Sequence, residues 1–186
     1  MGRQGEATAE VEQALRLDPL NPFFQALAGV VLMSQRRFDD AIAKFHVAMK
    51  TPPPNPVVLW NLWECYYSKG MYDEAAATAK YLFAIPPEDR ELIEVLAHHY
   101  PKDGYRATVK LLADALSHTT YINPGDVAAL YAMAGEKDLT IVWLEKAYTV
   151  HDLNMVYLNM TPALGDLLGN DPRFKDLLRR MHLPSH

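Results

Sequence analysis

The chain has one cysteine, Cys65, among its 186 residues, which excludes an internal disulfide framework. Its longest apolar run falls far short of the roughly 18–20 residues that a membrane-spanning helix needs. The first residues do not read as a secretory segment. We therefore expect a reducing, cytoplasmic setting and no membrane partner.

Clustered positive charge is also scarce. The net charge is −5, and a surface that binds phosphate groups needs clustered Lys and Arg. The one dense basic group lies near the end and alternates with apolar residues; it comprises Arg173, Lys175, Arg179 and Arg180. This pattern predicts the solvated face of a capping helix, with a minor nucleic-acid contact as the alternative. We expect no direct nucleic-acid partner.

Motifs that carry chemistry are missing as well. The sequence has no CxxC pair and no zincin spacing, and its glycines are scattered singly rather than gathered in a phosphate-binding loop. His98 and His99 are adjacent, so on a helix they point in different directions and do not chelate one ion. Cys65 reads as a small buried apolar residue. We therefore expect no enzyme activity, no cofactor and no metal.

What the sequence does have is a fixed spacing that recurs along the chain. Ala7, Ala41 and Ala75 follow it. Three prolines follow it too: Pro19, Pro53 and Pro87. A fixed period of about 34 residues predicts helix–turn–helix units stacked into a solenoid.

The stretches between Pro, Gly and Asn breakers read as helices. Asn21 and Pro22 fit an N-cap and a first-turn proline. The predicted helices span 5–17, 22–34, 38–50, 56–69, 73–84, 89–99, 104–118, 124–134, 138–150, 162–168 and 172–181.

Residue types recur at fixed places within these units. The first full unit has Gly29, Ala41 and Phe45, and the second has Leu62, Tyr66 and Ala75. The last unit has Val127-Ala128-x2-Tyr131. The pattern resembles the tetratricopeptide repeat (TPR) family. The resemblance implies an all-α fold, a right-handed TPR superhelix of antiparallel helix pairs (an α-solenoid), with a C-terminal capping helix.

The same resemblance implies a single domain over residues 1–186. Its parts are a half repeat at 2–19, repeats at 22–53, 56–87, 90–118 and 121–152, and a C-terminal cap at 153–186.

Small residues at the helix crossings let two helices approach to about 8–10 Å. We expect Gly29 and Ala97 to serve this purpose on the first helices of their units. Trp63 departs from the pattern, because it occupies the small-residue position. Either its helix rotates or the helix pair opens locally there.

Residues 121–181 are similar to the TPR arrays that end certain bacterial signalling and transcriptional regulator proteins. The resemblance covers Tyr121–Ala132, Trp143–Tyr148 and Asn170–Met181. It departs at Leu153, where a proline is usual. None of the output domains of those proteins is present in this sequence.

In the family, the first helices line a concave groove. If this chain keeps that register, the wall carries Phe23, Ala26, Val30, Met33, Trp60, Asn61, Glu64, Tyr67, Glu94, His98, Ala129 and Met133. From these we select as peptide-binding residues Met33, Trp60, Asn61, Glu64, Tyr67, Glu94 and His98. The family members that grip C-terminal carboxylates need Lys, Arg and Asn here, and only Asn61 matches. An apolar or helical peptide with some basic character fits better.

The sequence thus predicts a non-catalytic protein–protein interaction module or scaffold, part of a larger bacterial signalling protein. The alternatives are that Trp60 and Tyr67 only pack against neighbouring helices, that the chain self-associates through helix 5–17 as a homo-oligomer, or that an unfamiliar catalytic site lies between helices. The identity of a protein or peptide partner is not encoded in any motif.

Overall fold

The computed structural model describes residues 4–85, 89–119 and 123–184. Within these ranges the chain forms eleven α-helices, one 3₁₀ helix and no β-strand, which confirms the predicted all-α class. Pro87, Glu88, Tyr121 and Ile122, which the repeat pattern uses, lie outside the described residues.

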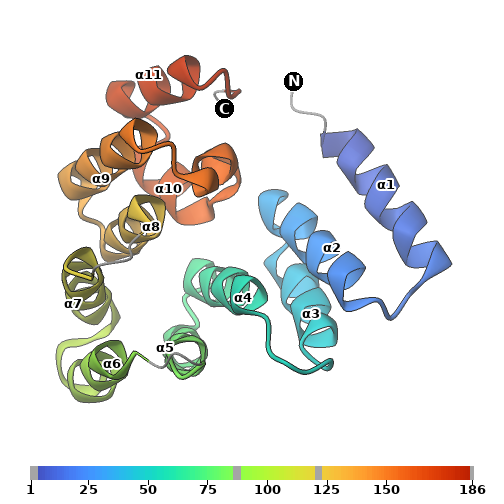
Figure 1. Cartoon of the computed structure of the whole chain (residues 1–186), viewed down its shortest axis with the longest axis horizontal. Helices are drawn as coiled ribbons and strands as arrows, with labels where there is room; N and C mark the ends of the chain where they lie inside the picture. Colours follow the sequence, from blue (N-terminus) through green and yellow to red (C-terminus); the bar gives the residue numbers. More distant parts are fainter. Residues whose placement is uncertain (1–3, 86–88, 120–122, 185–186) are drawn as a thin grey trace. The chain divides into compact units, whose positions relative to one another are not determined.

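The chain divides into two compact units, Met1–Glu88 and Asp89–His186 (Figure 1). Unit 1 contains α1 (Gln4–Leu17), α2 (Pro22–Ser34), α3 (Phe38–Ala48), α4 (Pro56–Ser68) and α5 (Tyr72–Phe83). Unit 2 contains α6 (Arg90–Asp103), α7 (Tyr105–Ser117), α8 (Pro124–Ala134), α9 (Lys137–Thr149), η1 (Leu153–Met160), α10 (Pro162–Leu168) and α11 (Pro172–Arg180).

Most helix boundaries agree with the prediction to within about two residues. α6 is the exception, because it continues through Pro101 to Asp103 rather than ending at residue 99. The 3₁₀ helix η1 was not predicted. Asn21 caps α2 as predicted, since its Oδ1 accepts hydrogen bonds from the N–H groups of Phe23 and Phe24 at 3.0 and 3.4 Å.

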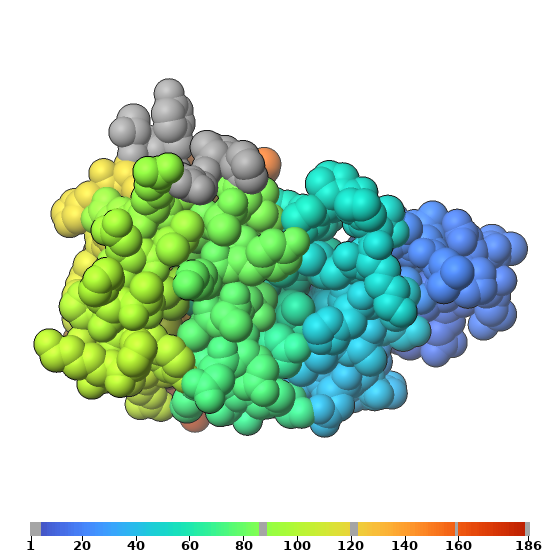
Figure 2. Space-filling view, turned by 90° about the horizontal axis from the view of Figure 1, so that it is seen from below, coloured from blue at the N-terminus to red at the C-terminus, as the bar shows by residue number. Residues whose placement is uncertain are grey.

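Consecutive helices pack against one another within each unit. In unit 1, α2 pairs with α3 and α4 with α5, while α1 packs on α2 and α3 on α4. The surface of unit 1 accordingly runs in chain order from the blue of α1 to the green of α5 (Figure 2). In unit 2, α6 to α9 pack in sequence in the same way. This consecutive pairing is the packing expected of a helical solenoid.

The crossing of α2 and α3 depends on Gly29. A Cβ atom at this position would overlap the ring of Phe45, which is fully buried. We call residues that stand one repeat period apart in the sequence register mates. The register mates of Gly29 and Phe45 in the next repeat are Trp63 and Ala79, both fully buried. The large and small residues have therefore exchanged helices, so that each repeat again combines one large and one small buried residue at these positions.

This exchange explains how Trp63 occupies a small-residue position. Its ring stacks edge-on against Phe83 and Trp60, at centroid distances of 5.8 and 5.3 Å. α4 and α5 pack against one another, and Trp63 is fully buried between aromatic neighbours.

Ala97 does not act as the expected close-approach residue. The packing face of α6 carries Leu92 and Leu96, which are 1% and 4% exposed. Ala97 follows Leu96 by about 100° around the helix and is exposed. The expectation that it lies at a helix crossing was wrong.

Unit 2 closes one face of α8. This helix is buried from Val127 to Met133 because α10 and η1 pack on it in addition to α7 and α9. Ala129 and Met133, which were expected to line an open groove, are 5% and 0% exposed. That expectation was wrong, because α7, α9, α10 and η1 all pack on α8. Among the described helices, none combines the length and the apolar character needed to cross a membrane.

The turns within three of the helix pairs share a positive φ angle at equivalent positions. Arg36, Gly70 and Gly104 are register mates, and all three have positive φ angles, of 60°, 72° and 80°. Only glycine adopts such angles without a steric penalty, which is about 1–2 kcal/mol for other residues. Arg36 is therefore strained where its two register mates are not.

We expect Gly70→Ala and Arg36→Gly to have opposite effects on stability. The first places a Cβ on a left-handed residue that has open space around it, so it should lower the free energy of unfolding by about 1 kcal/mol through the backbone alone. The second should raise it by about 0.5 kcal/mol, because relief of strain exceeds the loss of the Arg36 contact over the Phe38 ring. Denaturant unfolding followed by tryptophan fluorescence checks both; changes of the same sign would contradict the repeat alignment of these turns.

Candidate peptide-binding surface

The first helices of the two full repeats in unit 1 share an exposed apolar surface. Phe23 and Leu27 of α2 are 64% and 38% exposed, and Val57 of α4 is 68% exposed. Phe23 and Val57 are register mates on helices that contact one another. They therefore present the same side of the repeat, which we call the inner face and define as Phe23, Leu27, Val57, Trp60 and Asn61.

Trp60 is the largest side chain of the inner face. It is half-buried, and its indole stacks edge-on against the fully buried Trp63. One edge of the ring is thus held by the core while the rest stays accessible. An aromatic ring anchored in this way loses little conformational freedom when it binds a partner.

Asn61 and Tyr67 lie six residues apart on α4, and both are half-buried. The Asn61 side-chain amide donates a hydrogen bond to the Val57 carbonyl of its own helix at 2.7 Å. Tyr67 packs against Tyr72 with ring centroids 6.4 Å apart. These contacts fix the two side chains on the surface of α4.

Met33 and Glu64 lie deeper than the sequence suggested. They are 3% and 2% exposed, so they form the floor beneath the inner face and are not surface contacts in this structure. Periodicity identifies the side of the helix on which a residue lies, but the neighbouring helices decide its depth.

Glu94 and His98 belong to unit 2. Both are exposed, one turn apart on α6, and His98 Nδ1 lies 3.0 Å from the Glu94 carbonyl oxygen. They form a polar ridge of their own. The sequence selection therefore contains two groups, the α2–α4 residues of unit 1 and the α6 pair of unit 2.

Sequence reasoning missed Leu27 and Val57 as parts of the surface. The signal for Val57 was available, because it stands one repeat after Phe23, which had been placed on the groove wall. Leu27 stands in the same way one repeat before Asn61.

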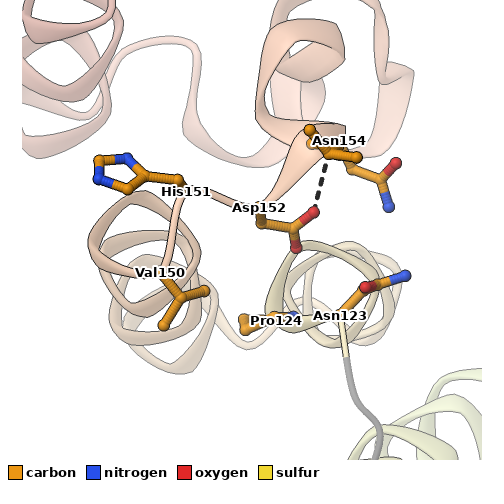
Figure 3. A pocket seen from close by; sticks show the side chains of 7 residues that line it. Asn123, Pro124, Val150, His151, Asp152 and Asn154 are labelled. Atoms are coloured by element: carbon orange, nitrogen blue, oxygen red, sulfur yellow. Dashed lines mark hydrogen bonds between the residues drawn. The ribbon is translucent and has the colours of Figure 1, made fainter.

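A second surface feature is a pocket of about 350 Å³ at the start of α8, lined by Asn123, Pro124, Val150, His151, Asp152, Leu153 and Asn154 (Figure 3). Asp152 is the centre of this pocket. Its carboxylate accepts hydrogen bonds from the N–H groups of Gly125 and Asn154, at 2.8 and 2.9 Å. It thus satisfies one of the open N–H groups at the start of α8 and ties the 150–154 turn to that helix.

Asp126 lies beside this carboxylate and is half-buried. Burial raises the pKa of Asp126 to about 6, and the nearby charge of Asp152 acts in the same direction, against hydrogen bonds from the side chains of Asn123 and Asn154. The contacts of both carboxyl groups are those of a structural clamp that holds the last repeat together.

The remaining candidates for chemistry are metal-binding side chains and the Cys65 thiol. Among the described residues no group of three His, Cys, Asp or Glu side chains is placed to hold a metal ion. Cys65 is fully buried, and burial raises the pKa of its thiol, which disfavours the reactive thiolate.

Comparison with protein families identifies a repeat family in part of the chain. Residues 32–98 match a family model described as the tetratricopeptide repeat. The matched segment covers just over a third of the chain and includes α3, α4 and α5, with Trp60, Asn61 and Tyr67 inside it. No curated protein matches the chain.

The Asp126 pKa leads to a prediction for the pH dependence of stability. Because the folded-state pKa of about 6 exceeds the unfolded value of about 4, the folded protein binds the extra proton between these pH values. The contribution of Asp126 to the free energy of unfolding therefore falls as the pH rises through this window.

We expect Asp126→Asn to gain stability relative to the wild type by about 1–2 kcal/mol between about pH 4 and pH 7, after allowance for solvent screening. Denaturant unfolding at a series of pH values measures this difference. The exposed substitution Glu91→Gln in the same unit is the control, for which the difference should stay flat. A flat difference for Asp126→Asn would contradict the assigned burial.

Proposed function

We propose that this chain is a non-catalytic interaction module that binds an apolar peptide or helix of a protein partner on the inner face of unit 1. Three exposed apolar side chains, Phe23, Leu27 and Val57, beside the anchored ring of Trp60, carry this proposal. Contiguous apolar surface on two adjacent helices is typical of recognition sites. The repeats of the matched family generally mediate protein–protein interaction, which supports the same conclusion.

Within this surface we assign distinct roles. Trp60 and Val57 provide the apolar contacts, and Asn61 and Tyr67 provide polar groups at the edge. Met33 and Glu64 are buried residues of the same two helices, and Glu64 adds a carboxyl group to α4 beneath its surface. This arrangement favours a ligand with an apolar face and some basic character.

In unit 2, considered by itself, we propose Glu94 and His98 as polar contacts for a partner, because they are exposed at consecutive turns of α6. For the larger context we propose a bacterial signalling or regulatory protein in the cytoplasm. The similarity of residues 121–181 to the ends of such arrays supports this context.

The test begins with a photo-crosslinking amino acid at position 57 to identify a partner in a lysate of the host cell. The affinity of that partner is then measured for the wild type and for Trp60→Ala and Val57→Asp. Loss of an anchoring aromatic or insertion of a charge should weaken binding by at least about tenfold.

The matched control is Tyr81→Ala, which removes a half-exposed aromatic ring from α5, away from the inner face. This variant should bind within about twofold of the wild type. Unchanged affinity in both inner-face variants, with circular dichroism showing intact helices, would reject the proposal.

Self-association through α1 is a second candidate, and one observation favours it. Ala7 is exposed, whereas its register mates Ala41 and Ala75 are 0% exposed because α2 and α4 cover them. The matching face of α1 is thus uncovered among the described residues. A helix from a second copy could cover it in the same way.

If this face forms a dimer contact, Ala7→Glu should abolish dimers by placing a charge at a close helix crossing. Sedimentation equilibrium measures the dissociation constant of the wild type and the variant. Gln13→Glu is the control, because residue 13 lies on another side of α1. A monomeric wild type at the highest concentration would exclude self-association.

A further inference from the structure

A cleft of about 330 Å³ lies between α1, α2 and α3 of unit 1. Its apolar walls come from Leu15 of α1 and from Ala28 and Leu32 of α2, and its rim includes Glu12, Ala43 and Lys44. Most of its surface is apolar, and its charged lining residues are Glu12, Arg37, Asp40 and Lys44. This composition is typical of small binding sites.

The next repeat shows what normally fills this space. The register mate of Leu32 is Tyr66 of α4, whose side chain is 8% exposed. The Tyr66 hydroxyl lies 2.9 Å from Nε2 of His46 on α3, so the phenol group bridges two neighbouring helices through a hydrogen bond. His46 is in turn the register mate of Glu12.

The first repeat lacks this phenol group and has smaller walls. Leu32 stands in the position of Tyr66, and Ala28 in the position of Leu62. Glu12 stands in the position of His46, the residue that contacts the Tyr66 hydroxyl. Leu32 is correspondingly half-buried rather than buried. The cleft is therefore the space that a tyrosine ring and its neighbours occupy one repeat later.

We propose that this cleft binds the side chain of a tyrosine presented by another polypeptide. The ring would lie against Leu15, Ala28 and Leu32, where Tyr66 lies in the following repeat. The phenol hydroxyl would donate a hydrogen bond to the Glu12 carboxylate, which takes the place of His46. The charged rim, with Lys44 and the ion pair of Arg37 and Asp40 at 2.6 Å, would face the polar backbone around the tyrosine.

This site is separate from the inner face. It is formed by α1, α2 and α3 and contains none of the inner-face residues, so either proposal can fail without the other.

The test uses p-cresol, which reproduces the tyrosine side chain, with toluene as the probe that lacks the hydroxyl. Both are titrated into the full chain and followed by two-dimensional NMR. p-Cresol should cause saturable shifts confined to α1, α2 and α3, and should bind about tenfold more tightly than toluene because of the hydrogen bond to a charged group. Glu12→Ala should remove that tenfold difference without changing the affinity for toluene. N-acetyl-tyrosinamide should bind the same residues at least as tightly as p-cresol.

Two variants close the cleft. Leu32→Tyr supplies the ring that the next repeat has, and should raise the melting temperature while reducing p-cresol binding by at least about tenfold. Ala43→Tyr blocks the rim from an exposed position, so it keeps the test valid if the first variant does not fold. The opposite substitution in the next repeat, Tyr66→Leu, should open a second cleft between α3, α4 and α5 that binds p-cresol.

Non-saturable shifts, shifts spread outside the three helices, equal binding of p-cresol and toluene, or unchanged binding in Ala43→Tyr would each overturn the proposal. Binding of p-cresol without binding of N-acetyl-tyrosinamide would also overturn it, because the site would then exclude a tyrosine within a polypeptide.

Discussion

Each helix pair of unit 1 depends on one steric constraint, namely that a large side chain at the crossing faces a small one. In the first full repeat, Gly29 leaves room for the fully buried Phe45; in the second, Trp63 is matched by Ala79. Phe45, Trp63 and Ala79 are all fully buried, and close packing of large against small side chains specifies a single arrangement of helices. Since α4 carries both Trp63 and Trp60, the same constraint also positions the aromatic ring of the inner face.

Equivalent positions of the repeats differ in solvent exposure, because different elements pack over them. On α8, Ala129 and Met133 are buried, and α10 and η1 pack on this helix in addition to α7 and α9. On α2 and α4, Phe23 and Val57 are exposed because no described helix of unit 1 packs over them in this way. A short helix of the chain itself, with Ala163, Leu164 and Leu168 buried, is thus an internal example of the kind of segment that such a helix face accepts.

The repeat period was enough to predict the helices, their pairing and the burial of Ala41 and Ala75, because all of these depend on residue type at fixed positions. It was not enough to predict the exposure of Ala97, since α6 packs through Leu92 and Leu96 and turns the neighbouring position outward. Nor could it predict the depth of Met33 and Glu64, because depth depends on the neighbouring helices. The coverage of α8 by α10 depends on a contact between segments with no repeat relation, so no pattern in the sequence encoded it.

The open cleft beside Leu32 can be understood from the same physics. An enclosed cavity lowers stability because its walls lose contacts that nothing replaces, and the loss grows with the cavity volume. A cleft open to water loses less, because solvent enters it and hydrates the charged rim of Glu12 and Lys44. Replacement of a bridging tyrosine by leucine is therefore tolerable beside the open cleft, where Leu32 is half-buried, and much less so between α3 and α5, where Tyr66 is buried. The cleft beside Leu32 is thus a position where the fold tolerates a ring-sized space, and because the cleft is open, a ring from another chain can enter it.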